Sequence, residues 1–258
     1  MSVLWEDTHR VHRMWKGKTV SVVFSTYREK ASIRSSIEDF FNTGLVDEIV
    51  VVNNNAEPGT DDEVKKTRAR LVYETKQGYG YGYQRGIQEA KGDYIILSEP
   101  DGTYAGGDVE KLLVYGKEFP VVVGSRNNQS TIFEVAAMGF LRKWANLLVA
   151  KVIELLFNTN ALTEVGCTYK LFRRDILKEL EPYWHTRNAL FATELLLLVI
   201  SKRIPFIEIP IVFRERVGTS SLTAHWYNLV KWGLHILFFI LSFWTVWIFG
   251  KLFRRGVK

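Results

Sequence analysis

The chain has 258 residues, of which 47% are hydrophobic, a composition that excludes a disordered chain and allows one domain with a large core. Its single cysteine, Cys167, excludes any disulfide within the chain. The formal net charge of +6 favours anionic partners, such as phosphorylated substrates, acidic lipids or nucleic acid.

Apolar runs and helical patterns alternate along the first half of the chain. The short β-branched runs predicted as strands are residues 20–24, 48–54, 70–74, 93–97 and 121–124. The segments between them that are predicted as helices are residues 33–41, 61–68, 82–90 and 107–115. Strands that alternate with helices predict an α/β fold around a parallel sheet.

Polar side chains follow four of these strands. They are Ser25 with Thr26, Asn53 with Asn54, Glu99 with Asp101, and Ser125 with Arg126. Parallel sheets bind ligands beyond the carboxyl ends of their strands, so these positions predict a binding site. Two carboxylates one residue apart at the end of a core strand need a partner. The residues alone leave two partners open: a metal ion, or hydrogen bonds to Ser125 or Arg126 without a metal.

The stretch QGYGYGYQRG, at residues 77–86, is rich in glycine. It lacks the dinucleotide-binding spacing G-x-G-x-x-G, and it follows the third strand rather than the first, which disfavours a nicotinamide enzyme. Two interpretations stay open: a flexible loop that enters a helix, or a loop whose backbone lies close to a ligand.

Six segments together resemble one protein family. In chain order they are VVFSTYRE (22–29), EIVVVNNN (48–55), KQGYGYGYQRGIQEAKGDYIILSEPDGTY (76–104), VVVGSR (121–126), VGCTYKLFRRDIL (165–177) and FATELLLLVISKRIPFIEIPIVFRERVGTSSL (191–222). The ordered set is similar to the inverting family-2 glycosyltransferases, and within them to the dolichyl-phosphate mannose synthase-like enzymes that glycosylate polyprenyl phosphates. The resemblance implies a GT-A fold, which is a Rossmann-like, mainly parallel sheet with flanking helices.

The resemblance also implies a divalent metal, Mg²⁺ or Mn²⁺, at the family's D-x-D position, where this chain has Glu99 and Asp101. The metal would neutralise charge on the leaving diphosphate. Asp101 is expected as a direct ligand, Glu99 as a ligand directly or through water, and Thr103 as a third polar ligand. The expected catalytic residues are Asp101, Glu164 and Arg126. For Glu164, which stands where the family often has Asp, a structural salt bridge is the open alternative.

The same resemblance implies which residues contact each substrate. Those expected to bind a nucleotide diphosphate sugar are Ser25, Thr26, Tyr27, Glu29, Asn53, Asn54, Gln77 and Gly78, together with Asp101. Those expected to bind the phosphate of a polyprenyl phosphate are Arg173, Arg214, Arg216, Ser220 and Ser221. The family usually has Asp at the end of the second strand, and a Ser-Lys pair where this chain has two serines.

The segment from Trp232 to Gly250 contains no Asp, Glu, Lys or Arg and, extended back to Leu229, is long enough as a helix to span a bilayer core of about 30 Å. We expect a catalytic domain at residues 1–222, on the cytoplasmic face of a membrane. A membrane-anchoring helix and basic tail would occupy residues 223–258, and a homo-oligomer formed through this helix is a further candidate.

Two features bear on how the chain meets the membrane. The stronger basic cluster follows the apolar segment, which opposes a single crossing under the positive-inside rule and favours an oblique, in-plane or re-entrant helix. A second stretch, residues 138–157, is expected either at the membrane surface or packed on the sheet.

The favoured function is therefore the inverting transfer of a sugar from a nucleotide diphosphate sugar to a polyprenyl phosphate, with membrane lipids as further partners and no nucleic-acid partner. Two alternatives stay open: a glycosyltransferase with a glycan or glycolipid acceptor, and a degenerate family member that binds nucleotide as a scaffold. The departures at Glu99, Asn53 and Ser221 keep the scaffold alternative open.

Overall fold

The computed structural model of the chain describes residues 15–127, 140–218 and 226–255. The strands in this part form one seven-stranded sheet in the order β3-β2-β1-β4-β6-β5-β7. They are β1 (Val20–Thr26), β2 (Glu48–Asn53), β3 (Arg70–Tyr73), β4 (Tyr94–Ser98), β5 (Val121–Ser125), β6 (Lys170–Arg173) and β7 (Phe206–Pro210). Neighbouring strands are parallel except where β6 pairs with β4 and β5. The predicted mainly parallel α/β sheet is confirmed.

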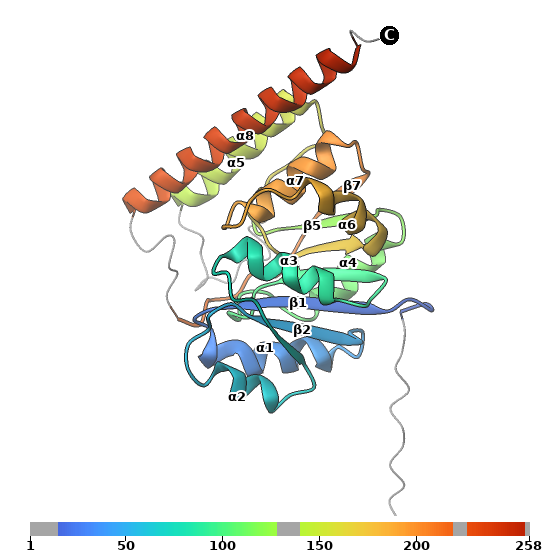
Figure 1. Ribbon diagram of the computed structural model, residues 1–258, viewed down its shortest axis with the longest axis vertical. Coiled ribbons are helices and arrows are strands. Elements are labelled where there is room, and N and C mark those ends of the chain that lie inside the picture. Colours follow the sequence, from blue (N-terminus) through green and yellow to red (C-terminus); the bar gives the residue numbers. More distant parts are fainter. Residues whose placement is uncertain (1–14, 128–139, 219–225, 256–258) are drawn as a thin grey trace, which may run out of the picture.

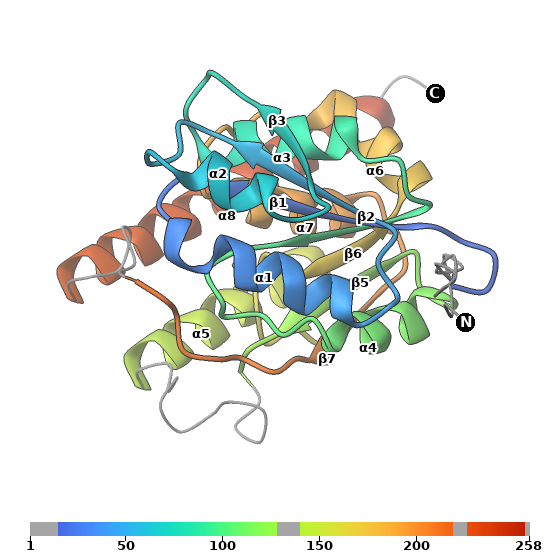
Figure 2. The same cartoon turned by 90° about the horizontal axis from the view of Figure 1, so that it is seen from below.

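Helices cover both faces of the sheet (Figure 1). They are α1 (Lys30–Asn42), α2 (Thr60–Lys65), α3 (Tyr79–Glu89), α4 (Asp108–Gly116), α5 (Phe140–Phe157), α6 (Arg174–Leu180), α7 (Phe191–Ser201) and α8 (Trp226–Arg255), with a short 3₁₀ helix, η3 (Glu181–Tyr183). Figure 2 shows the molecule from the side of α1 and α2, with the sheet behind them.

The core consists of two apolar clusters, one on each face of the sheet. Successive residues of β2 alternate between them: Ile49 and Val51 join the cluster with α1, α2 and α4, whereas Val50 and Val52 join the cluster with α3, α5, α6 and α7. Because both faces are covered, the central strands are apolar at nearly every position. This double burial explains the continuous apolar runs that identified the strands.

The glycine-rich stretch is mostly helical, because α3 begins at Tyr79. Its glycines let α3 lie unusually close to its neighbours. A Cβ atom at Gly86 would lie 2.3 Å from Val23 Cγ1, and one at Gly82 would lie 2.0 Å from Ser25 Oγ. Gly80 donates a backbone hydrogen bond to the Arg187 carbonyl at 3.0 Å. The glycines therefore serve close packing of α3 on β1.

Helices α5 and α8 lie side by side at one end of the molecule and run in the same direction (Figure 1). The Trp244 Nε1 atom donates to the Leu156 carbonyl at 2.7 Å, and the Trp247 Nε1 atom donates to the Ser201 carbonyl at 3.2 Å. Ile240 is fully buried in the core cluster with α5 and α7. Helix α8 is thus packed on the rest of the protein along one side.

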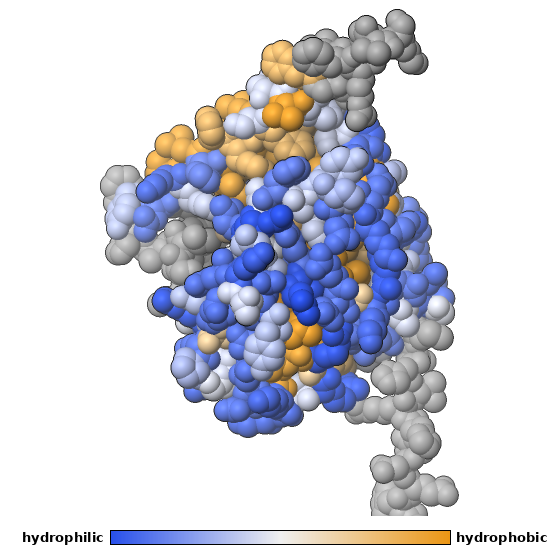
Figure 3. Space-filling model, viewed as in Figure 1, coloured by the Kyte–Doolittle hydropathy of each residue, from blue (hydrophilic) through white to orange (hydrophobic). Residues whose placement is uncertain are grey.

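The other side of α8 carries exposed apolar residues. Leu234, Phe238, Leu241, Val246 and Phe249 are exposed, and α5 adds Trp144, Leu148 and Leu155. Figure 3 shows the resulting hydrophobic surface over these two helices. Within the described residues, the segment Val230–Phe249 alone has the length and mean hydropathy of a membrane span, and little of it is buried. The expected boundary between residues 222 and 223 lies outside the described residues.

The close approach of α3 to β1 generates a stability prediction. Gly86→Ala should lower the free energy of unfolding by about 1–3 kcal/mol, because the added methyl group overlaps Val23 and Val52. Gly107→Ala is the matched control, since a Cβ at Gly107 meets no atom within 4 Å and its φ of −57° suits alanine. Thermal unfolding of both variants checks this, and equal midpoints for the two would contradict it.

Candidate functional site

Four strand ends bring polar side chains to one edge of the sheet. The register pairs Thr26 with Asn53, so the ends of β1 and β2 lie level. Lys170 of β6 pairs with both Leu97 and Val123, so the segments that follow β4 and β5 also lie level, on either side of β6. The carboxyl ends of β1, β2, β4 and β5 therefore meet at one edge, as the sequence predicted.

One guanidinium group lies among three carboxylates at this edge. The Arg216 Nη1 atom is 2.7 Å from Asp101 Oδ2 and 3.8 Å from Glu99 Oε2. The Arg216 Nη2 atom donates to Glu29 Oε1 at 3.2 Å. Glu29 itself precedes α1 and accepts hydrogen bonds from the backbone of Tyr27 and from the Thr26 hydroxyl. Arg216 thus neutralises carboxylates from two different strand ends.

The Asp101 side chain is 1% exposed and rigidly held. Its Oδ1 atom accepts hydrogen bonds from the Thr103 backbone and hydroxyl, at 3.0 and 2.6 Å. Its Oδ2 atom accepts no hydrogen bond from the described residues and faces Arg216. The preceding Pro100 carbonyl accepts hydrogen bonds from Ser32 and Ser36 of α1. Thr103 therefore positions Asp101 and leaves one buried carboxylate oxygen available to a cation.

The Glu99 side chain is less buried and is held by the segment that precedes β6. The Thr168 hydroxyl donates to Glu99 Oε1 and is itself hydrogen bonded to the Tyr79 hydroxyl. Burial and the neighbouring Asp101 charge raise the pKa of Glu99 to about 7, so it loses its proton near neutral pH. Neither Thr168 nor Tyr79 was among the predicted site residues. Both stand in segments that resemble the family, which is the only sequence signal that pointed to them.

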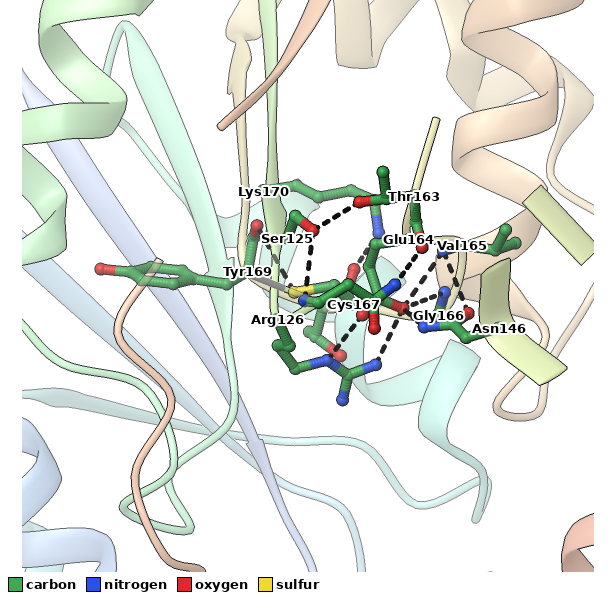
Figure 4. Close-up of polar contacts among 12 residues, drawn as sticks. Ser125, Arg126, Asn146, Thr163, Glu164, Val165, Gly166, Cys167, Tyr169 and Lys170 are labelled. Carbon is green, nitrogen blue, oxygen red and sulfur yellow. Dashed lines mark hydrogen bonds and ion pairs between the residues drawn. The ribbon is translucent and has the colours of Figure 1, made fainter. Parts of the chain in front are cut away.

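A second charge pair lies at the end of β5 (Figure 4). The Arg126 Nε and Nη2 atoms donate to the two Glu164 oxygens, each at 3.0 Å. Glu164 is fully buried and also accepts hydrogen bonds from the Asn146 amide and from the backbone of Val165 and Gly166. Although burial favours its neutral form, the Arg126 charge and these hydrogen bonds hold the pKa of Glu164 below its ordinary value.

Glu164 is therefore a buried carboxylate whose two hydrogen bonds orient the Arg126 guanidinium. Arg126 also lies over the Phe213 ring, 5.5 Å from its centroid. Its remaining nitrogen, Nη1, makes no hydrogen bond to the described residues. A guanidinium fixed in this way can bind a phosphate oxygen through Nη1. The structural salt bridge that the sequence left open for Glu164 is present.

The residues predicted to bind the nucleotide diphosphate sugar, which is the donor substrate, divide into two groups. Ser25 and Thr26 end β1, and Tyr27 and Glu29 follow it, beside the carboxylates. The Asn53 and Asn54 amides are instead engaged with the protein: Asn53 donates to Asp61 at 2.6 Å, and Asn54 binds the segment 74–78, including the Gly78 backbone at 2.8 Å. Asn54 thus holds the Gln77-Gly78 turn in place.

The residues predicted to bind the phosphate of the polyprenyl phosphate, which is the acceptor substrate, do not all lie close together. Arg173 donates to the carbonyls of Gly116 and Lys117, and it pairs with Tyr94 at the opposite end of β4, far from the carboxylates. Arg214 forms an ion pair with Asp39 at 3.1 Å. Ser220 and Ser221 lie outside the described residues. Of this set, Arg216 alone is seen at the carboxylates, among the residues that the structure describes.

A cavity of about 420 Å³ lies next to the Arg126 pair. Its lining comes from the ends of β5 and β7, from α5 and from the loop before β6: Ser125, Asn127, Lys143, Leu147, Thr163, Glu208, Ile209 and Pro210. Leu147, Ile209 and Pro210 give this lining an apolar part, Lys143 contributes a cation and Glu208 contributes a carboxyl group. Sequence reasoning missed Lys143, because nothing in the apolar pattern of residues 138–157 distinguishes it from a surface lysine.

The carboxylates of Glu99 and Asp101, here called the donor carboxylates, fit a divalent cation. Asp101 Oδ2 is buried without a hydrogen bond, Glu99 Oε2 faces the same place, and carboxylate oxygens are what hard cations prefer. Within the described residues, no group of three or more His, Cys, Asp or Glu side chains forms a metal-binding cluster. A metal held here would therefore need further ligands, and substrate phosphate oxygens are the usual source for Mg²⁺.

The sequence is similar to those of known proteins. Residues 21–181 match the family described as Glycosyl transferase family 2. A dolichyl-phosphate beta-glucosyltransferase of Saccharomyces cerevisiae is 26% identical over 235 residues, which cover 80% of this chain and 70% of that protein. A dolichyl-phosphate hexose transferase of Haloferax volcanii is 24% identical over 204 residues, which cover 79% of this chain and 86% of that protein.

A solved structure has the same fold. Glucosyl-3-phosphoglycerate synthase from Mycobacterium tuberculosis, in complex with Mn²⁺, UDP-glucose and phosphoglyceric acid, is similar with a TM-score of 0.71 at 17% identity. The similarity covers 89% of this chain and 81% of that chain, and it confirms the predicted GT-A fold. Because the family match spans more than half of the sequence, the chain belongs to glycosyl transferase family 2.

Proposed function

We propose that the protein transfers a hexose from a nucleotide diphosphate sugar to a polyprenyl phosphate, with inversion at the anomeric carbon. The observation that carries this proposal is the placement of the Glu99-Asp101 carboxylates and the Arg126 guanidinium at one edge of the sheet. The carboxylates suit a metal-bound donor, and the guanidinium suits an acceptor phosphate. The names of the relatives support a lipid phosphate acceptor and a hexose donor.

The donor side rests on Asp101 and Glu99, which would hold Mg²⁺ or Mn²⁺ together with diphosphate oxygens. When bound, the metal supplies positive charge that stabilises the departing diphosphate. Thr103 keeps Asp101 in position through its two hydrogen bonds. The end of β1 with the residues that follow it, from Ser25 to Glu29, and the Gln77-Gly78 turn are the proposed nucleotide contacts.

The acceptor side rests on Arg126 and the adjacent cavity. Arg126 Nη1 would bind the lipid phosphate, while Glu164 fixes the plane of the guanidinium. Lys143 provides a second cation at the cavity, whose apolar lining suits the first hydrocarbon units of the lipid. A role for Arg214 at the acceptor phosphate remains part of the proposal, whereas the placement of Arg173 offers it no support.

The proposed reaction needs no strong general base. A phosphate oxygen already carries negative charge, so it can attack the anomeric carbon directly as the bond from that carbon to the diphosphate breaks. The nucleotide diphosphate leaves with the bonding electrons. The ionised state of Glu164 agrees with this chemistry, because a carboxylate with a lowered pKa is a poor base.

We further propose that α5 and α8 rest on the cytoplasmic face of a membrane. Helix α8 is packed on α5 and α7 through Ile240, Trp244 and Trp247, so a perpendicular crossing would remove these contacts. An in-plane or oblique position keeps them and buries the exposed apolar face in lipid. The exposed Lys231 on α8 would attract anionic lipids. Self-association through α8 stays a prediction.

Turnover is the first test of the proposed function. Purified protein in lipid or detergent should transfer hexose from a UDP-hexose to a polyprenyl phosphate when Mn²⁺ is present, and chelation should stop the reaction. Radiolabelled sugar in the lipid fraction is the readout. Transfer to a glycan or glycolipid in place of the lipid phosphate would contradict the acceptor assignment. Nucleotide binding without any turnover would favour a scaffold.

Asp101→Asn tests the donor site. It should weaken Mn²⁺-supported UDP binding by at least about tenfold, which corresponds to about 1.4 kcal/mol, because the buried oxygen that faces the cation loses its charge. Asp93→Asn is the matched control at the opposite end of β4, where Asp93 binds Thr19. Glu99→Asp should retain binding. Calorimetry that finds equal UDP affinity in the two asparagine variants would remove Asp101 from the site.

Glu164→Gln tests the acceptor site. The amide cannot accept both hydrogen bonds from Arg126, so the guanidinium should lose its fixed orientation. We expect the KM for lipid phosphate to rise several-fold more than the KM for the nucleotide sugar. Steady-state kinetics with each substrate varied in turn give the comparison. A loss of kcat alone, with both KM values unchanged, would indicate a direct catalytic role for Glu164.

Phe238→Gln combined with Val246→Gln tests the membrane surface. Each side chain is more than two-thirds exposed on α8, so the double variant should fold normally but bind vesicles at least about tenfold more weakly, since burying one such side chain contributes about 1.5–3 kcal/mol. Val114→Gln with Tyr115→Gln on α4 is the matched control. Co-sedimentation with anionic vesicles measures this, and equal binding of both double variants would place the anchor elsewhere.

A further inference from the structure

We infer that Arg216 is a resident counter-cation of the donor carboxylates, which a bound metal ion must displace. Loading of the donor site would then remove the ion pair between Asp101 and Arg216, and so loosen the hold of the loop that follows β4 on the segment from Phe213 to Val217. This inference rests on the proposed function, because it concerns the same metal and donor site. It adds a coupling between that site and the segment leading to α8.

Arg216 is the cation that lies between three carboxylates. Its guanidinium approaches Asp101, Glu99 and Glu29, at 2.7, 3.8 and 3.2 Å, and the Asp101 side chain is only 1% exposed. Three carboxylates so close together repel one another unless a cation lies between them. Arg216 provides that cation in the absence of a metal. Its own side chain is 30% exposed, so it can leave toward solvent.

A bound metal ion would compete with Arg216 for the same carboxylate oxygens. A divalent cation on Asp101 Oδ2 and Glu99 Oε2 would occupy the place of Arg216 Nη1, because both cations use the same two oxygens. Like charges at such a separation repel strongly even in a polar environment. The two cations therefore exclude each other. The guanidinium must move when the metal and its diphosphate arrive.

Backbone hydrogen bonds fasten the segment that contains Arg216 to the loop that follows β4. The Val217 amide donates to the Asp101 carbonyl, and the Arg214 amide donates to the Thr103 carbonyl, both at 2.9 Å. Phe213 forms a bridge with Tyr104 in the same arrangement. Arg216 thus belongs to a segment fastened along the donor loop. Displacement of the guanidinium removes the ion pair that joins this segment to Asp101, so that the two backbone hydrogen bonds, the Phe213 bridge and the Glu29 contact are left to hold it.

The segment that contains Arg216 leads along the chain to α8, so the exchange of Arg216 for a metal ion would affect the segment before that helix. Helix α8 begins eight residues after Gly218, so the segment that carries Arg216 also leads to the proposed membrane surface. Arrival of the donor would therefore loosen a segment whose Phe213 ring also lies against Arg126.

Arg216→Gln tests the competition without any measurement of turnover. In the absence of nucleotide, Mn²⁺ should bind this variant at least about tenfold more tightly than the wild-type protein, because the competing charge is gone. Arg34→Gln is the matched control, since Arg34 is an exposed arginine of α1 that pairs with Glu38 and not with the donor carboxylates. It should change Mn²⁺ affinity less than about twofold, because an exposed, solvent-screened charge has little influence. Electron paramagnetic resonance of free Mn²⁺ gives both affinities.

A spin label at residue 217 tests the loosening of the segment. Val217→Cys places the label at an exposed position, and the native Cys167 is buried and should not react. Addition of Mn²⁺ with UDP should increase the mobility of the label in this otherwise wild-type protein. Mobility that stays the same, or falls, would contradict the loosening.

The outcomes separate this inference from the proposed function. An unchanged or weaker Mn²⁺ affinity in Arg216→Gln would overturn the inference and would make Arg216 a partner of the metal. Absence of Mn²⁺ binding in every variant would overturn both the inference and the metal site. Tighter binding in Arg216→Gln without sugar transfer by the wild-type protein would support the inference and reject the proposed function alone.

Discussion

The Asp101 carboxylate needs a cation, and the organisation of the site depends on that need. Its side chain is almost fully buried, and Thr103 satisfies only one of its two oxygens. Glu99 and Glu29 lie close by and add further negative charge. A buried carboxylate among other carboxylates is costly unless a positive charge compensates it. The fold supplies Arg216 for this purpose, on a segment outside the sheet.

Two ion pairs at the carboxyl edge of the sheet differ in how firmly they are held. The Arg126–Glu164 pair has two parallel hydrogen bonds, and Glu164 is fully buried, so this pair is fixed. The Arg216–Asp101 pair has a single close contact, and Arg216 is partly exposed, so this pair can exchange. A fixed cation suits the recognition of a phosphate, whereas an exchangeable one suits a site that alternates between empty and metal-bound states. This difference supports placing the acceptor at Arg126 and the donor at Asp101.

Local patterns predicted much of the fold and part of the site. Four of the five strands of the first half, β1, β2, β4 and β5, were predictable because both of their faces are buried, and the edge strand β3 was predictable from its short apolar run. The antiparallel pairing of β6 was not, because four residues contain no information about direction, and the contact of Thr168 with Glu99 depends on it. Arg214 and Arg216 are two residues apart, yet they bind different partners. Partner choice here depends on non-local packing that spacing does not specify.

A crystal structure of the protein with Mn²⁺ and a UDP-hexose would test the central claim most directly, because anomalous scattering locates the metal independently of the protein. We predict Mn²⁺ at Asp101 Oδ2, with the Arg216 guanidinium displaced from its present distance of 2.7 Å. Manganese bound at another place, with Arg216 still paired to Asp101, would contradict the account.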